Sequence, residues 1–142
     1  MEAREEMLKA SFKAGFAFTR AGVGNVHAIA HTMGGIYGTP HGLANAVILP
    51  IVLEDYGEVV YKKLAHLAEI SGGDEEKAKA FIAEIYAMNK RMGIPEGLHV
   101  EEKDIPQMVE WALAEANPTY PVPVLYDEAR CAAVIRRINE RA

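Results

Sequence analysis

The sequence predicts an all-α fold, a bundle of about six or seven helices joined by short loops. Apolar residues recur at helical spacing through most of the chain, most clearly at 74–92, where Phe81, Ile82 and Ile85 share one side. That segment opens on acidic residues and ends at Gly93, as helices do. The only β-branched run, at 59–63, flows into a helical pattern, so no strand ladder is expected. At 142 residues, the chain is expected to form a single helical domain, 1–142.

The other helices follow from the same periodicity. We expect them at 3–19, in a short segment after Asn25 that carries His27 and His31, from 41 to about 55, at 59–71, from 104–106 onward and at about 126–139. In the first, Phe12 and Phe16 are interpreted as core aromatics. Asn25 is expected to cap the second helix, and Pro50 to kink the third or end its first part.

Composition excludes several classes of protein. A net charge of -5 argues against a nucleic-acid partner. No apolar run is long enough to span a bilayer, and the charged N-terminal residues do not resemble a secretory signal, so no membrane partner is expected. Cys131 is the one cysteine, which rules out an internal disulfide, and its apolar setting favours a buried structural thiol. We therefore expect a cytoplasmic protein.

Three of the five histidines lie close together in the sequence. His27 and His31 are four residues apart, so they share a face of a helix. A Gly- and Pro-rich turn then precedes His41, and it allows the chain to double back towards His27. Three converging imidazoles would make a metal or catalytic site, whereas isolated histidines are ordinary core or surface residues; spacing alone leaves both open. Ala28 follows the first histidine where zinc proteases carry Glu, so that class is excluded.

Asn45 falls in an unusually apolar helix and needs hydrogen-bond partners. We expect it to cap the adjoining helix, with a substrate contact as the alternative. His66 and His99 are expected to be structural or exposed, not ligands.

The stretch VHAIAHTMGGIYGTPHGLANAVILP resembles the signature of the iron-containing (group III) alcohol dehydrogenases. The shared pattern is a His, a second His four residues later, Gly-rich turns, and then Pro-His-Gly, Asn-Ala and Leu-Pro. Nearly the whole chain is similar to the helical C-terminal domain of that family, which is also the architecture of dehydroquinate synthase-like proteins. The resemblance implies that His27 and His41 are metal ligands, and that catalytic His31 lies beside the nicotinamide and the substrate.

The resemblance also implies a reaction: NAD(P)-dependent oxidation of an alcohol, or reduction of an aldehyde or ketone, assisted by Fe²⁺ or Zn²⁺. The family's N-terminal α/β domain, its Gly-rich phosphate loop and its upstream Asp and His ligands have no counterpart here. We therefore expect part of such an enzyme that is inactive alone and binds metal weakly at most. Without the family's other regions, apolar surface would stay exposed and promote a homo-oligomer, in which the copies exchange their first helices.

Two alternatives remain at this stage. One is a stand-alone helical oligomerisation or interaction module that inherited the motif without the chemistry. The other is part of a glycerol-dehydrogenase-like enzyme, although the Pro-His-Gly-Leu-Ala-Asn-Ala run at 40–46 favours the alcohol dehydrogenases.

Overall fold

A computed structural model describes residues 2–68 and 72–142. Within these residues, the chain forms seven α-helices and one short 3-10 helix, and no strand. In chain order they are α1 (Glu2–Ala21), α2 (Asn25–Tyr37), α3 (His41–Tyr56), α4 (Glu58–Ala68), α5 (Asp74–Arg91), η1 (Glu102–Asp104), α6 (Ile105–Ala116) and α7 (Glu128–Glu140). The predicted all-α bundle is confirmed.

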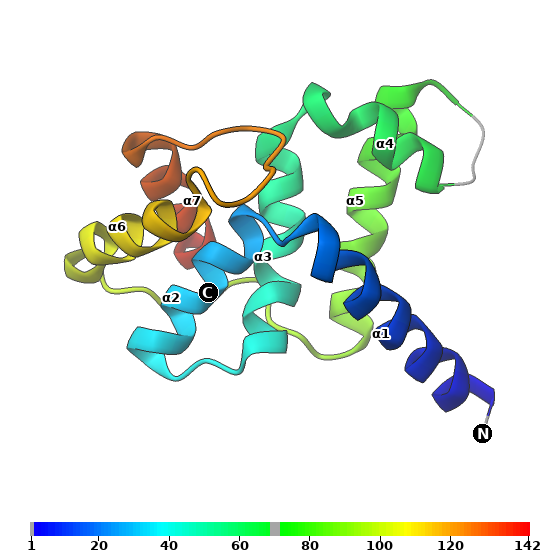
Figure 1. Cartoon of the computed structure of the whole chain (residues 1–142), viewed down its shortest axis with the longest axis horizontal. Helices are drawn as coiled ribbons and strands as arrows, with labels where there is room; N and C mark the ends of the chain where they lie inside the picture. The colour runs from blue at the N-terminus through cyan, green and yellow to red at the C-terminus, as the bar shows by residue number, and fades with distance from the viewer. Residues whose placement is uncertain (1, 69–71) are drawn as a thin grey trace.

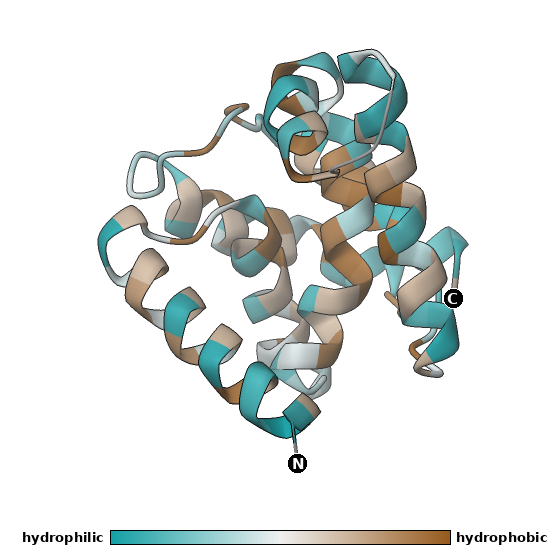
Figure 2. Cartoon of the chain, turned by 90° about the vertical axis from the view of Figure 1, so that its right-hand side faces the viewer, coloured by the Kyte–Doolittle hydropathy of each residue, from teal (hydrophilic) through white to brown (hydrophobic). Residues whose placement is uncertain are grey.

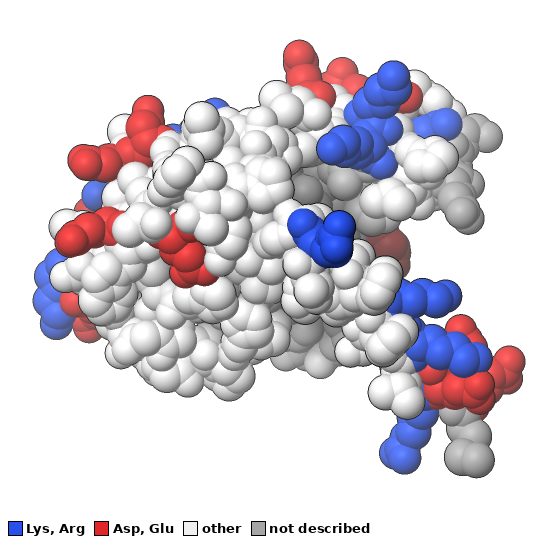
Figure 3. All heavy atoms as spheres, in the orientation of Figure 1, with Lys and Arg blue, Asp and Glu red and all other residues white. Residues whose placement is uncertain are grey.

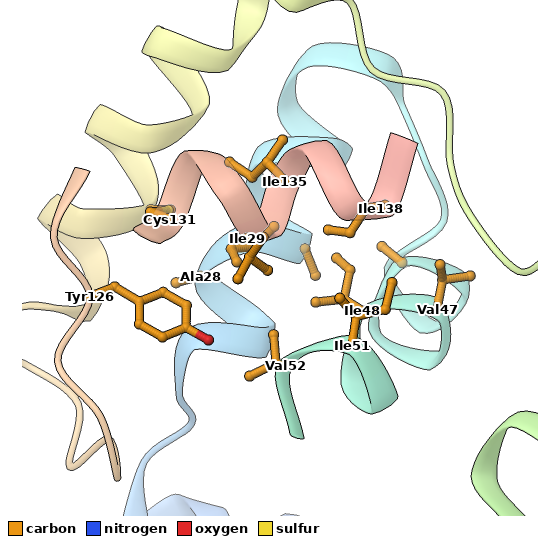
Figure 4. Packing of buried hydrophobic residues seen from close by; sticks show 14 of the residues in the cluster. Ala28, Ile29, Val47, Ile48, Ile51, Val52, Tyr126, Cys131, Ile135 and Ile138 are labelled. Atoms are coloured by element: carbon orange, nitrogen blue, oxygen red, sulfur yellow. The ribbon is translucent and has the colours of Figure 1, made fainter. Parts of the chain in front are cut away.

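Helix α3 lies at the centre of the bundle (Figure 1). It packs against α2, α5 and α7, while α4 and α5 pair with each other and α6 covers both α2 and α7. Helices α2, α3 and α7 meet in the core, where Ile29, Ile48 and Ile135 lie together and are almost fully buried (Figure 4). Burying a side chain of this size contributes about 1.5–3 kcal/mol of stability. The helices that carry the three histidines therefore rest on the best-packed part of the molecule.

Pro50 lies inside α3, which continues to Tyr56, so of the two expected effects, a kink or an end of the helix, the end does not occur. Proline has no N–H, so the carbonyl of Ala46 one turn earlier loses its helical donor. The side chain of Asn89 on α5 replaces that donor, with Nδ2 2.7 Å from the Ala46 oxygen. Asn89 is itself buried, which makes this contact a hydrogen bond between helices in the core.

Helix α1 stands apart from the bundle (Figure 1). It has no buried residue, and the side chains of Phe12 and Phe16 are 75% and 74% exposed. The interpretation of these residues as core aromatics was therefore wrong, because no other described helix packs on them. Figure 2 shows brown, apolar segments along α1 with no element over them. Gly22, the residue directly after α1, lies beside Tyr120 and Pro121 of the body.

Three further expectations concern Cys131, the extent of α4 and the absence of a membrane-spanning helix among the described residues. Cys131 is buried, and burial raises the pKa of its thiol to about 12, as befits a structural cysteine. Leu67 on α4 is exposed, and the last residues of the helix predicted at 59–71 lie outside the described part of the chain. None of the described helices combines the length and the hydropathy needed to cross a membrane.

Candidate metal centre

The first residue of α2 is anchored by its side chain. Asn25 is buried, and its Nδ2 donates to the carbonyl of Val124, 3.0 Å away in the loop before α7. The N-cap position is Gly24, without a side-chain cap, so the expectation that Asn25 caps the helix was wrong. Asn25 instead joins the start of α2 to a loop almost one hundred residues later in the sequence. His27 lies two residues further along the same helix.

The turn between α2 and α3 reverses the chain as expected. Gly38 adopts a left-handed conformation with φ 66°, which glycine accepts without strain. Its N–H donates to the carbonyl of Gly34, and the N–H of Thr39 donates to that of Met33. Helix α3 then begins at His41, directly after Pro40. The turn thus returns the first residue of α3 to the face of α2 that carries His27.

The three imidazoles converge. Their ring centroids lie 5.9 Å apart for His27 and His31, 5.2 Å for His27 and His41, and 5.1 Å for His31 and His41. The rings of His31 and His41 are stacked at 20°, whereas those of His27 and His41 are tilted by 55°. The convergence that their spacing allowed is present in the structure.

The separation of His27 and His41 is compatible with one shared metal ion. Two imidazoles bound tetrahedrally to an ion at about 2.0–2.1 Å would have their ring centres roughly 5 Å apart. The observed 5.2 Å fits that arrangement. No group of three or more His, Cys, Asp or Glu side chains within 2–68 and 72–142 is already arranged to hold an ion. These residues therefore fit a metal as part of its ligand shell.

The environment of His27 favours the neutral imidazole, the form that binds metals. Partial burial lowers the pKa of His27, and the neighbouring rings of His41 and His31 lower it further. The carboxylate of Glu115 acts in the opposite direction and is the weakest of these influences. Protons therefore compete with a metal at His27 only below the pH at which an ordinary histidine titrates.

His31 differs from the other two because it has a carboxylate partner. Its Nδ1 lies 2.7 Å from Oε1 of Glu115, which comes from α6. The hydroxyl of Tyr120 donates to the same oxygen at 2.6 Å. Sequence reasoning identified neither residue as functional: Glu115 is 84 positions from His31, and no local spacing links them.

Asn45 lies one helical turn after His41 and against its ring. Its Nδ2 is 3.1 Å from Nε2 and 3.4 Å from Nδ1 of His41. Such similar distances to both nitrogens place the amide over the ring face, since an in-plane hydrogen bond would favour one nitrogen clearly. The same Nδ2 donates to the His41 carbonyl, so the expectation that Asn45 caps the adjoining helix was wrong. Its Oδ1 is buried without a partner among the described residues.

An apolar cleft of about 570 Å³ opens beside His27 and Asn45. Its walls come from three segments: the 21–24 connector, the α3 face carrying Leu49 and Leu53, and the loop at 121–123. Figure 3 shows the charged side chains mainly at the margins of the face it draws and on α1. His66 and His99 are exposed, as expected, and neither joins the three imidazoles.

Comparison with known proteins places this site in a family. Residues 1–138 match the family model described as Fe-containing alcohol dehydrogenase family, C-terminal. The fold, the histidine motif and this match agree: the chain belongs to the iron-containing alcohol dehydrogenase family.

Individual relatives share the same region. The 1,3-propanediol dehydrogenase of Klebsiella pneumoniae is 39% identical over 96% of this chain and 38% of its own length. The lactaldehyde reductase of Escherichia coli is 36% identical over 79% of this chain and 32% of its length. A crystal structure of 1,3-propanediol oxidoreductase superposes with a TM-score of 0.90 at 40% identity, over 96% of this chain and 38% of that one. The chain thus spans well under half the length of these relatives.

Proposed function

We propose that residues 1–142 are the helical metal-site part of an iron-type alcohol dehydrogenase, which oxidises an alcohol, or reduces an aldehyde or ketone, with NAD(P). The observation that supports this most directly is the convergence of His27, His31 and His41 within a sequence matched by the family along almost its whole length. Small alcohols and aldehydes are the substrates consistent with the names of the relatives.

Each imidazole has a proposed role. His27 and His41 would hold a divalent ion, Fe²⁺ or Zn²⁺, through neutral ring nitrogens, and the lowered pKa of His27 favours that form. Such an ion supplies Lewis-acid polarisation of the alcohol oxygen. His31 would lie beside the nicotinamide and accept the alcohol proton. The remaining ligands and the nucleotide site would come from regions that these residues do not include.

The proposal is tested by adding Zn²⁺ to the 142-residue chain and following the histidine side-chain resonances by NMR. We expect weak binding that shifts the His27 and His41 signals at pH 7.5 and weakens towards pH 5.5, because protons compete for the imidazoles. The same sample is expected not to reduce NAD(P) with a simple alcohol. Unperturbed His27 and His41 signals, or alcohol-dependent NAD(P) reduction by the chain alone, would contradict the proposal.

We further propose that residues 1–142 form a single helical domain in a cytoplasmic protein. One continuous hydrophobic cluster runs from α2 to α7, which supports one folding unit. A lone, buried cysteine is typical of a reducing compartment.

A second copy of the chain is the proposed partner of α1. Leu8, Phe12 and Phe16 form an exposed apolar stripe along this helix. Acidic residues lie in its first turn and Arg20 in its last, so an antiparallel pair of α1 helices would bring opposite charges together. This complementarity favours a homodimer through α1.

The dimer is tested by light scattering coupled to gel filtration. We expect the double variant Phe12→Ser/Phe16→Ser to dimerise at least about tenfold more weakly, because each phenylalanine would lose over 1 kcal/mol of apolar burial. Met92→Ser, which changes an exposed apolar residue beyond α5, is the control and should leave the dimer intact. A wild-type chain that stays monomeric at high concentration would refute the proposal.

A further inference from the structure

Glu115 makes two hydrogen bonds through one oxygen. Its Oε1 lies 2.7 Å from Nδ1 of His31 and 2.6 Å from the Tyr120 hydroxyl. A carboxylate can only accept hydrogen bonds, so both partners must donate. The proton of a neutral His31 ring is therefore on Nδ1, and Nε2 carries the lone pair.

The elements around this contact keep it in place. Glu115 lies in the last turn of α6, and α6 packs directly on α2, which carries His31. Tyr120 follows in the adjoining loop, where its N–H donates to the carbonyl of Ala116 at the end of α6. The hydrogen bond to Glu115 raises the pKa of Tyr120 to about 12, so its hydroxyl remains a donor at neutral pH. The carboxylate of Glu115 is thus oriented by two donors, His31 on α2 and Tyr120 in the loop after α6.

We propose that Glu115 is a positioning residue, itself hydrogen-bonded by Tyr120, which holds His31 in its Nδ1–H tautomer and leaves Nε2 free to accept the proton of the substrate hydroxyl. In that step the O–H bond of the alcohol breaks, the proton forms an N–H bond at Nε2, and the carboxylate of Glu115 offsets the imidazolium charge. The inference rests on the proposed function only in naming the alcohol hydroxyl as the group that gives its proton to Nε2 of His31. The tautomer itself is a property of the chain alone.

The tautomer is measured on the 142-residue chain with ¹⁵N-labelled histidine, by long-range ¹H–¹⁵N correlation at a pH about two units above the ordinary histidine value. We expect wild-type His31 to show a protonated Nδ1 and an unprotonated Nε2. In Glu115→Ala the pattern should reverse, because the acceptor that fixes the proton on Nδ1 is gone. In Tyr120→Phe it should persist, since the carboxylate remains.

Glu110→Ala is the matched control. It removes the same type of side chain from the same helix, where Glu110 accepts a hydrogen bond from Gln107, and it should leave His31 unchanged. The proposal is overturned if wild-type His31 carries its proton on Nε2, a result that requires no variant to fold. It is also overturned if folded Glu115→Ala retains the Nδ1–H form. Neither result depends on Zn²⁺ binding. Failure of the proposed function would appear in the Zn²⁺ titration, and failure of this inference in the tautomer of His31.

Discussion

Replacing either His27 or His41 with alanine is expected to weaken Zn²⁺ binding by well over tenfold. Removing a residue that only orients a ligand already weakens metal binding by about 10–100-fold, and these two side chains are proposed to bind the ion themselves. The separation of their rings, 5.2 Å between centroids, suits a single shared ion. The measurement is competition between the chain and a chromophoric zinc indicator at pH 7.5.

Two comparisons make this result specific. His66→Ala and His99→Ala remove exposed imidazoles that lie outside the cluster, and they should leave the affinity unchanged. His31→Ala should have a smaller effect than His27→Ala, because the proposed role of His31 is to accept the alcohol proton and not to bind the ion. If all three cluster variants lose affinity equally, His31 is a ligand and the assigned roles are wrong.

The second large effect concerns the hydrogen bond between α5 and the proline-containing helix α3. Asn89→Ala is expected to lower the free energy of unfolding by about 1–3 kcal/mol, because it leaves the partly buried carbonyl of Ala46 without a donor. In a Pro50→Ala background the backbone N–H at position 50 would supply that donor. There the effect of Asn89→Ala should be smaller by about 1 kcal/mol or more.

This double-mutant cycle is measured by urea unfolding, followed through the fluorescence of Trp111, the single tryptophan. Lys90→Ala changes an exposed neighbour on the same helix and should stay within about 0.5 kcal/mol of wild type. Equal effects of Asn89→Ala with and without Pro50 would show that Asn89 does not compensate for the proline.

Local signals explain why most of the fold was predictable. Helix α5 has a continuous apolar stripe, an acidic first turn and a Gly-Ile-Pro stop, and its observed bounds agree closely with those predicted. The helices around Pro106 and Cys131 were found in the same way. Helical spacing reports which residues share a face, but it does not report whether anything covers that face. This is why α1 was recognised as a helix while Phe12 was wrongly placed in the core.

The same distinction between local patterns and contacts made by helix packing applies to the candidate site. His27, His31 and His41 lie within one helix–turn–helix, so their spacing and the turn chemistry at Gly38 indicated that they could meet, which the structure confirms. The contacts that fix them come from distant segments. Glu115 reaches His31 from α6, and Val124 accepts the hydrogen bond that anchors Asn25. Such pairings depend on how the helices pack, which no local pattern encodes.

The isolation of α1 also bears on how the chain unfolds. Without tertiary contacts, the 20 residues of α1 depend on their own backbone hydrogen bonds and on local charge pairs such as Lys9 with Glu5. A helix of this length is only marginally stable in water. In a single copy of the chain, α1 should therefore fray well before the cooperative unit that begins at Asn25 melts. Circular dichroism would combine a gradual loss of helicity with one sharp transition, and only the latter reports the strength of the core.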